Sequence, residues 1–449
     1  MAENQKTENK TGVMNPYRQY MYSYPHKTAY GPLEGVFLGD YASCLTGREN
    51  GLYLHIPFCQ SKCGYCNLFS VTGQSGEAVD RYLQAVERQC RQYQEVLEEG
   101  SPLFSQVVIG GGTPLYLTEA QLDRMFSMLH RYFHLEEPAG RDTVIETAPG
   151  QTTKEKLHLL KQAGVTRVSL GIQSFSEREL SVLGRRHDGR RAREALALLQ
   201  SFDFPCINVD FIYGIPGQTA DSLLDSLKEA VSFGPDEIFL YPLYVKHGAG
   251  MERDGVVPDG GAAFAQYQAG AGFLRAAGFR QDSMRRFVRK QERRAYTECG
   301  FGTSLALGCG GRSYLGNLHF CSPYAVTRGE CLARLAEYEA IIDYTKITHG
   351  FLLSEDEMRR RYVIRHLLIR PGLELARYKA RFGKDVRRDF PLLDEWTEQG
   401  FARAEGGFLT LTQAGLDLSD YLGPRLTSSQ VQNAMREWEE SHERAYDII

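Results

Sequence analysis

Three cysteines in one short segment are the residues of this chain best suited to metal chemistry. Cys59, Cys63 and Cys66 stand in HIPFCQSKCGYCNLF with the spacing CxxxCxxC, directly after the apolar stretch 52–56. Thiolates are the usual ligands of iron–sulfur clusters, and three on one loop need no distant partner. Three protein ligands leave one metal position open, which is typical of metals that do chemistry. The segment therefore predicts a reactive iron–sulfur cluster.

The overall composition is that of a globular protein with room for more than one domain. The chain has 449 residues, of which 42% are hydrophobic and 24% charged. A net charge of −4 gives no electrostatic reason to expect nucleic acid. We find no run of about 18 apolar residues and no secretory signal, so no membrane association is expected. Ten cysteines fit a reducing compartment, and we expect the cytoplasm.

Strand-like and helix-like stretches alternate from about residue 51. Amphipathic helical stretches separate six β-rich runs, namely 52–56, 107–110, 143–147, 167–173, 207–214 and 237–244. This order predicts βαβ units with a parallel sheet, as a partial or full (β/α) barrel with its site at the carboxyl ends of the strands. The polar candidates fall there: the cysteine loop after the first run, GGGTP after the second, Glu146 and Gln173 ending the third and fourth, and Asp210 within the fifth.

Composition divides the chain into five predicted segments. They are a disordered tail (1–16), an aromatic strap (17–50), the barrel (51–278), a Gly-rich connecting region (279–349) and a C-terminal domain (350–449). The strap contains Tyr17, Tyr20, Tyr22, Tyr24 and Tyr30, whose rings either pack on the main domain or line a flat apolar pocket.

The C-terminal domain is predicted to be helical and winged-helix-like. Two helices, a third ending at Gly400 and a hairpin around Gly406 and Gly407 give this pattern. The run 359–361, three arginines, is more typical of a solvated helix face than of a DNA-binding site.

The cysteine segment and its neighbours closely resemble the radical S-adenosylmethionine (SAM) superfamily. The resemblance implies that the three cysteines bind three irons of a [4Fe-4S] cluster, and that the fourth iron chelates SAM. It also implies that Gly111, Gly112 and Thr113 of GGGTP contact the SAM amino group. Glycines at such a strand end let the backbone approach a ligand closely. Glu146 suits a ligand hydroxyl or ammonium group, although a salt bridge or helix cap is the alternative.

From Tyr53 to about Tyr244 the chain resembles the oxygen-independent coproporphyrinogen III oxidase group of that superfamily. In that group Tyr53 and Tyr65 also touch the first SAM. The group carries a second SAM, whose contacts correspond to Gln173, Arg185 and Asp210. The adjoining Arg186 and His187 fit a basic, solvent-facing loop.

One position departs from the pattern of the decarboxylating oxidase. That enzyme has a fourth cysteine two residues after the third, where this chain has Leu68. Relatives without it include a heme-binding chaperone and the class C radical SAM methylases. The later cysteines, Cys299, Cys309, Cys321 and Cys331, contain no CxxC pair, so we predict no auxiliary cluster there.

The resemblance thus implies a radical SAM enzyme that modifies an unidentified small or planar, tetrapyrrole-like molecule, with methyl transfer as one such reaction. An electron donor such as flavodoxin or ferredoxin is implied as its partner. Oxidative decarboxylation of coproporphyrinogen III and non-catalytic heme binding remain the alternatives.

Overall fold

The structure is a computed structural model and describes residues 16–21, 23–46, 49–97, 102–135, 141–246, 248–289 and 301–446. These residues form two compact units, each assembled from separate stretches of the chain. The barrel unit comprises Tyr30–Pro258 and Lys290–Leu352. The C-terminal unit comprises Met1–Ala29, Asp259–Arg289 and Leu353–Ile449. Most of the predicted tail and Tyr22 lie outside the described residues.

Six parallel strands form the centre of the barrel unit, as the sequence predicts. They pair in chain order: β2 (Asn50–Ile56), β5 (Phe104–Gly111), β6 (Asp142–Thr147), β7 (Arg167–Gln173), β8 (Cys206–Tyr213) and β9 (Glu237–Pro242). Their apolar side chains are buried, as in sheets that helices cover. Because all six run the same way, their carboxyl ends lie along one edge of the sheet.

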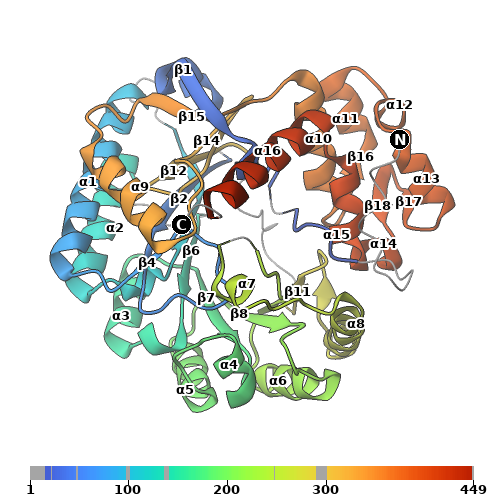
Figure 1. The fold of residues 1–449 in the computed structure, drawn as a ribbon, viewed down its shortest axis with the longest axis horizontal. Helices are drawn as coiled ribbons and strands as arrows, with labels where there is room; N and C mark the ends of the chain where they lie inside the picture. Colours follow the sequence, from blue (N-terminus) through green and yellow to red (C-terminus); the bar gives the residue numbers. More distant parts are fainter. Residues whose placement is uncertain are drawn as a thin grey trace. The chain divides into compact units, whose positions relative to one another are not determined.

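Helices follow these strands and lie outside them (Figure 1). They are α1 (Gly76–Leu97), α2 (Glu119–Phe133), α3 (Lys154–Gln162), the short α4 (Glu177–Val182), α5 (Gly189–Gln200) and α6 (Ala220–Ser232). Side-chain caps at Thr118, Thr153, Asp188 and Thr219 begin four of them. Helix α1 turns one face to the core, with Val79, Leu83, Val86, Cys90, Tyr93 and Leu97 buried at helical spacing.

The sheet continues beyond β2 with strands that the sequence did not predict. Strand β12 (Ser304–Leu307) pairs parallel with β2, followed in antiparallel pairing by β13 (Ser313–Leu315), β14 (Leu318–Phe320), β15 (Lys346–Leu352) and β1 (Gly31–Phe37). Helix α9 (Arg328–Ala340) connects β14 to β15. Residues 304–349 therefore contribute four strands to the sheet and one helix, although we expected a Gly-rich connection. Short strands between glycines leave no local periodicity, and long-range pairing determines them.

The barrel is partial. Within the barrel unit the strand order runs from β1 at one end to β9 at the other, and no pairing among the described residues joins β9 to β2 or β12. A short α7 (Gly250–Arg253) and the two-stranded pair of β3 (Phe58–Cys59) and β4 (Val71–Thr72) complete the unit.

The C-terminal unit contains the predicted winged-helix-like arrangement. Strands β16 (Leu373–Glu374), β18 (Phe408–Leu411) and β17 (Ala402–Glu405) form an antiparallel sheet. The helices around it are α10 (Glu355–Leu367), α11 (Leu375–Phe382), α12 (Val386–Asp389) and α13 (Leu392–Glu398). The turn of the β17–β18 hairpin uses the left-handed backbone of Gly406 and Gly407, at φ of 57° and 84°. The α-helices that follow the hairpin in the described residues are α14 (Gln413–Asp417), α15 (Ser419–Leu422) and α16 (Ser429–Tyr446).

Residues from two earlier parts of the chain join this unit. Helix α8 (Gly260–Ala276) and the hairpin of β10 (Arg280–Gln281) and β11 (Arg286–Val288) belong to it, although α8 falls within the segment predicted as the barrel, 51–278. The Tyr267 hydroxyl of α8 donates to Asp417 Oδ1 at 2.8 Å, which explains the grouping.

The predicted aromatic strap is divided between the units. Tyr17 packs edge-on against Phe264, and the Tyr24 hydroxyl donates to Glu357, so both tyrosines pack within the C-terminal unit. Tyr30 contacts Phe351 in the barrel unit, and the strand β1 follows it.

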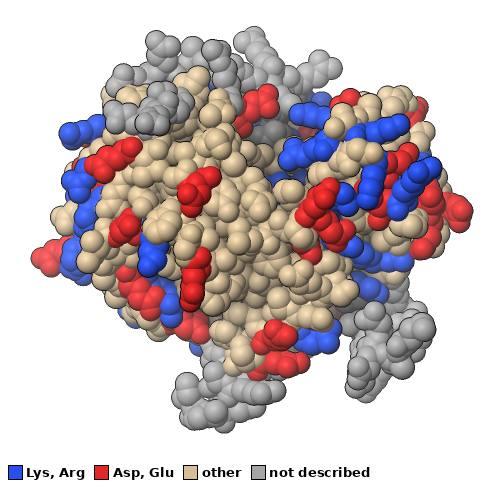
Figure 2. Space-filling view, turned by 90° about the horizontal axis from the view of Figure 1, so that it is seen from above, with Lys and Arg blue, Asp and Glu red and all other residues tan. Residues whose placement is uncertain are grey.

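No helix among the described residues has the length and apolar composition to cross a membrane. Basic and acidic side chains are both present on the face drawn in Figure 2, around an area that carries few charges. This is the mixed distribution that a net charge of −4 leads one to expect.

Candidate functional site

The cysteine loop begins at the carboxyl end of β2 and is closed at its base. Strand β3, which contains Cys59, pairs with β4 beyond the last cysteine, and the Val71 N–H donates to the Pro57 carbonyl at 2.7 Å. Within the loop the Cys66 N–H donates to the Cys63 carbonyl at 3.0 Å, which forms a tight turn. The loop therefore holds all three thiols at the edge where the parallel strands end.

The glycine turn after β5 lies directly against this loop. The Gly112 N–H donates to the Ile56 carbonyl and the Thr113 N–H to the Phe58 carbonyl, each at 2.8 Å. A Cβ at Gly112 would stand 2.7 Å from the Phe58 carbonyl oxygen and 2.9 Å from Cys59 Sγ, so only glycine fits. Thr113 Oγ1 lies 3.6 Å from Cys59 Sγ.

Glu146 faces the same turn from the next strand. Its Oε2 accepts the Gly111 N–H at 3.1 Å. Burial raises the pKa of Glu146 to about 7; the Gly111 hydrogen bond lowers it, and the nearby Asp210 raises it. The carboxylate thus lacks a cationic partner of its own among these contacts, and a ligand ammonium or hydroxyl group would supply one.

Arg185 reaches the cysteine loop from the segment after α4. Its Nη1 donates to Cys63 Sγ at 3.2 Å, and its Nη2 donates to the Gly171 carbonyl at the end of β7. Burial alone would lower the pKa of Arg185, but the neighbouring Tyr65 and Cys63 raise it overall, so the guanidinium keeps its charge. Arg185 therefore places a permanent cation beside a predicted iron ligand.

The other two residues predicted for a second SAM come from neighbouring strands: Gln173 ends β7, and Asp210 lies within β8. Gln173 is buried and has a left-handed backbone at φ 73°, a strained conformation for a residue other than glycine. Asp210 accepts from Asn208 Nδ2 at 2.8 Å and from the Ser169 hydroxyl at 3.1 Å. Burial raises the pKa of Asp210 to about 6, while these hydrogen bonds and the charge of Arg185 lower it.

The two predicted tyrosines occupy different surroundings. Tyr65 packs against an apolar cluster of Leu183, Ile212, Ile215, Leu243 and Met251. Burial and the adjacent Cys63 raise the pKa of Tyr65 well above its ordinary value. The Tyr53 hydroxyl lies 3.1 Å from His55 Nδ1.

His55 is a residue that the sequence analysis missed. Its Nε2 lies 2.9 Å from the Phe69 carbonyl at the far end of the cysteine loop, and its ring would contact a Cβ at Gly111 at 2.7 Å. It thus connects Tyr53, the loop and the glycine turn. The available signal was its position two residues after Tyr53, on the same face of a strand.

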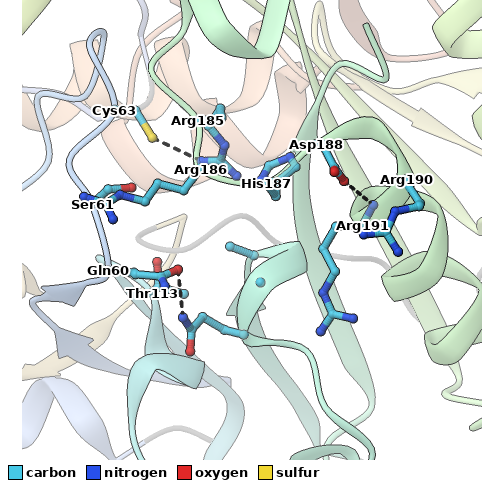
Figure 3. A pocket seen from close by; sticks show the side chains of 13 residues that line it. Gln60, Ser61, Cys63, Thr113, Arg185, Arg186, His187, Asp188, Arg190 and Arg191 are labelled. Carbon is cyan, nitrogen blue, oxygen red and sulfur yellow. Dashed lines mark hydrogen bonds between the residues drawn. The ribbon is translucent and has the colours of Figure 1, made fainter. Parts of the chain in front are cut away.

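A cavity of about 350 Å³ opens beside Cys63 and Thr113 (Figure 3). Its lining includes Gln60, Ser61, Gln151 and four arginines, namely Arg185, Arg186, Arg190 and Arg191. Gln151 Nε2 donates to Gln60 Oε1 at 3.3 Å. Arg186 is exposed as predicted, whereas His187 is partly buried with its Nε2 3.1 Å from the Ile172 carbonyl. Burial and then the charge of Arg185 lower the pKa of His187 to about 4, so its ring is neutral at pH 7.

The thiols fit a multi-iron cluster better than a single metal ion. No three His, Cys, Asp or Glu side chains within the described ranges converge closely enough to share one ion. In a [4Fe-4S] cluster each thiolate binds a different iron, so such convergence is not required. Burial raises the pKa of Cys59 to about 12, and the charge of bound iron would favour its deprotonation.

The later cysteines occupy other places. Cys309 and Cys331 are buried, and Cys309 Sγ lies 3.7 Å from the Ser322 hydroxyl and 3.5 Å from the Arg334 carbonyl. Cys299 lies outside the described residues.

Comparisons with known proteins show the family of the chain. The sequence matches the Radical SAM superfamily over residues 53–230 and the HemN C-terminal domain over residues 353–418. It is 31% identical to the heme chaperone HemW of Mycobacterium tuberculosis (strain ATCC 25618 / H37Rv) over 387 residues, which cover 84% of this chain and 94% of that protein. The chain belongs to the HemN/HemW family of radical SAM proteins.

Other members of the HemN/HemW family match over similar lengths. The oxygen-independent coproporphyrinogen III oxidase of Pseudomonas aeruginosa is 26% identical over 431 residues, with 89% of this chain and 92% of that protein covered. Among solved structures, coproporphyrinogen III oxidase (HemN) from Escherichia coli gives a TM-score of 0.75 at 22% identity, over 86% of this chain and 92% of that one. This likeness confirms the fold class, a partial (β/α) radical SAM barrel with a C-terminal domain.

Proposed function

We propose that this chain binds a [4Fe-4S] cluster through Cys59, Cys63 and Cys66 and uses the reductive cleavage of SAM to modify an organic molecule. The supporting observation is the convergence of the cysteine loop, the glycine turn and a buried carboxylate at one edge of the sheet. Thr113 Oγ1 lies 3.6 Å from Cys59 Sγ, and the Gly111 N–H lies 3.1 Å from Glu146 Oε2. Membership of the radical SAM superfamily implies both cofactors.

In this proposal the cluster, once reduced by a low-potential donor such as flavodoxin or ferredoxin, supplies the electron that cleaves SAM to methionine and a 5′-deoxyadenosyl radical. The chain's own residues bind SAM and shield it from water. Gly111 and Gly112 allow close approach of the SAM amino group, and Glu146 accepts hydrogen bonds from it or from the ribose. Tyr65 and its apolar cluster exclude water from the same edge. Arg185 offsets the negative charge of the Cys63 thiolate.

Methyl transfer requires a second SAM, for which Gln173, Arg185 and Asp210 are the candidates. Arg185 can pair with a carboxylate and Asp210 can accept from ribose hydroxyls. Their positions support this assignment, since Gln173 ends β7, Asp210 lies within the neighbouring β8, and Arg185 lies in the connection between the two strands. Tetrapyrrole-related compounds are the first substrate class to test, because relatives are named for coproporphyrinogen III and heme.

Heme delivery without catalysis is the second candidate. It is favoured by the 31% identity to a protein named heme chaperone over 94% of that protein. Decarboxylation of coproporphyrinogen has less support, because Leu68 replaces the fourth cysteine and exposes 47% of its surface.

The deciding experiment compares the two activities in one preparation. Anaerobically reconstituted protein is reduced with dithionite, incubated with SAM and assayed for 5′-deoxyadenosine, while a parallel sample is titrated with heme. The proposal expects 5′-deoxyadenosine in the wild type and none in Cys63→Ala. Tight 1:1 heme binding without SAM cleavage would replace the proposal by the chaperone function.

A further inference from the structure

Lys62 lies within the cysteine loop, directly before Cys63, and its side chain ties the loop together. Its Nζ donates to the Leu68 carbonyl at 3.5 Å and to the Val326 carbonyl. Since Leu68 stands two residues after Cys66, the ammonium group lies beside the segment that carries this thiol. Val326 belongs to the chain just before α9, so Lys62 also joins the loop to a distant part of the barrel unit.

No acidic side chain neutralises the charge of Lys62. Both of its acceptors are neutral carbonyl oxygens, and it forms no salt bridge within the described ranges of the chain. Glu330, which is close to Val326 in sequence, accepts the N–H groups of Val326 and Thr327 at 3.2 and 3.0 Å at the start of α9. Lys62 is partly buried, which weakens the screening of its charge by water and salt. The loop therefore carries a cation that two carbonyl groups hold in place.

This cation acts on a predicted iron ligand. Burial raises the pKa of Cys66, as does the neighbouring Cys63, whereas the Leu68 N–H and the charge of Lys62 lower it. Lys62 therefore stabilises negative charge on the Cys66 sulfur. Cys63 has a cation of its own, because Arg185 Nη1 donates to its Sγ at 3.2 Å. Two of the three predicted ligands are thus compensated by separate positive charges.

Negative charge at the sulfurs increases when an iron–sulfur cluster is reduced. The reduced cluster carries one more electron than the oxidised cluster, and its charge spreads over the iron and sulfur atoms. Net charge, hydrogen bonds to the sulfurs and the groups around the ligands set the reduction potential of such clusters. A fixed cation beside one sulfur stabilises the reduced form more than the oxidised form. It therefore raises the reduction potential, and a donor of given potential then reduces a larger fraction of the protein.

We propose that Lys62 is a positioning residue that raises the reduction potential of the cluster, through an ammonium group held beside Cys66 by the Leu68 and Val326 carbonyls. This inference rests on the proposed function, because it needs a cluster bound by the three cysteines. It goes further by assigning to a side chain outside the ligand set the control of how readily the cluster accepts an electron. The competing explanation is that Lys62 only anchors the loop, in which case its charge has no effect on the potential.

A redox titration of reconstituted holo-protein without SAM, followed by electron paramagnetic resonance of the reduced cluster, tests the proposal. Lys62→Met removes the charge and the hydrogen bonds, whereas Lys62→Gln keeps a hydrogen-bond donor without the charge. In both variants we expect about a tenfold loss in the equilibrium constant for reduction, which corresponds to a potential about 59 mV lower. Lys62→Arg keeps the charge and should recover most of this loss.

The matched control is Lys161→Met. Lys161 also donates to a backbone carbonyl, that of Asp203 at 2.9 Å. It lies in the last turn of α3, just before β7 begins, and so at the opposite end of the parallel strands from the cysteine loop. Its replacement should leave the potential unchanged, and an equal shift in this control would overturn the proposal.

Two other results would assign Lys62 to anchoring alone and overturn the proposal. One is a wild-type potential in Lys62→Gln, whether or not Lys62→Met shifts it. The other is a loss of iron in Lys62→Met with an unchanged potential in the cluster that remains. Either result would show that the charge of Lys62 does not control reduction.

The same preparations separate this inference from the proposed function. A lower potential in the two uncharged variants, with no 5′-deoxyadenosine formed by the wild type, would refute the proposed function alone. SAM cleavage by the wild type, with a potential that does not depend on Lys62, would refute the inference alone. A wild type that holds no cluster after reconstitution would refute both.

Discussion

Glu146→Gln should stabilise the apo-protein at alkaline pH while it weakens SAM binding. Burial raises the pKa of this carboxyl from its ordinary 4.5 to about 7. The folded state therefore holds a proton that the unfolded state releases, and the free energy of unfolding falls as the pH rises from 4.5 to 7. From pH 5.5 to pH 8.5, ionisation of Glu146 should lower the free energy of unfolding by about 2 kcal/mol. Each pH unit between 5.5 and the folded pKa contributes roughly 1.4 kcal/mol. Glutamine keeps an acceptor for the Gly111 N–H and carries no charge.

Urea unfolding of iron-free protein at the two pH values measures this effect. The stability of Glu146→Gln relative to the wild type should increase by about 2 kcal/mol from pH 5.5 to pH 8.5. The matched control for the loss of one carboxylate is Glu155→Gln, at an exposed position in the first turn of α3. In reconstituted protein, Glu146→Gln should weaken SAM binding about tenfold, because a ligand group loses its charged partner. A variant that is less stable at pH 8.5 and binds SAM normally would refute the reasoning and make Glu146 a structural residue.

Three further outcomes follow from the same contacts. Equilibrium dialysis should give close to two SAM per holo-chain if methyl transfer is the reaction, falling to one in Arg185→Ala/Asp210→Ala; one SAM in both proteins would remove that support. The His55→Phe variant should keep most of its iron but bind SAM about tenfold more weakly, because Tyr53 and the Phe69 carbonyl lose the partner that they share. Loss of iron in proportion to the loss of SAM affinity would show that His55 only stabilises the cysteine loop. Tyr24→Phe should destabilise the C-terminal unit by about 1–2 kcal/mol, because buried Glu357 loses one of its two described side-chain donors. The donor that remains is the Ser428 hydroxyl at 2.6 Å. An unchanged melting transition would contradict this.

Local patterns predicted the elements that carry the site. Each of the six predicted parallel strands is present. The cysteine loop, the GGGTP turn, Glu146 and Gln173 lie at or next to the strand ends, and Asp210 lies within β8. Burial on both faces gives such strands continuous apolar runs, which can be recognised from the sequence alone.

Contacts between distant segments were not predictable in this way. Strands β12 to β14 have three or four residues each, too few for a periodic signal, and they acquire their place by pairing across the chain. Helix α8 lies in the segment predicted as the barrel, but its Tyr267–Asp417 hydrogen bond, which joins it to the C-terminal unit, spans 150 residues. The left-handed backbone of Gln173 and the arginine-lined cavity likewise depend on the assembled fold.

The central claim is that Cys59, Cys63 and Cys66 hold a cluster with an open iron for SAM. Electron paramagnetic resonance of the reduced, reconstituted protein with and without SAM tests it most directly. We expect a [4Fe-4S]⁺ signal that shifts when SAM is added, and no such signal in the variant with all three cysteines replaced by Ala. A signal that SAM leaves unchanged, or one that persists in the triple variant, would contradict the claim.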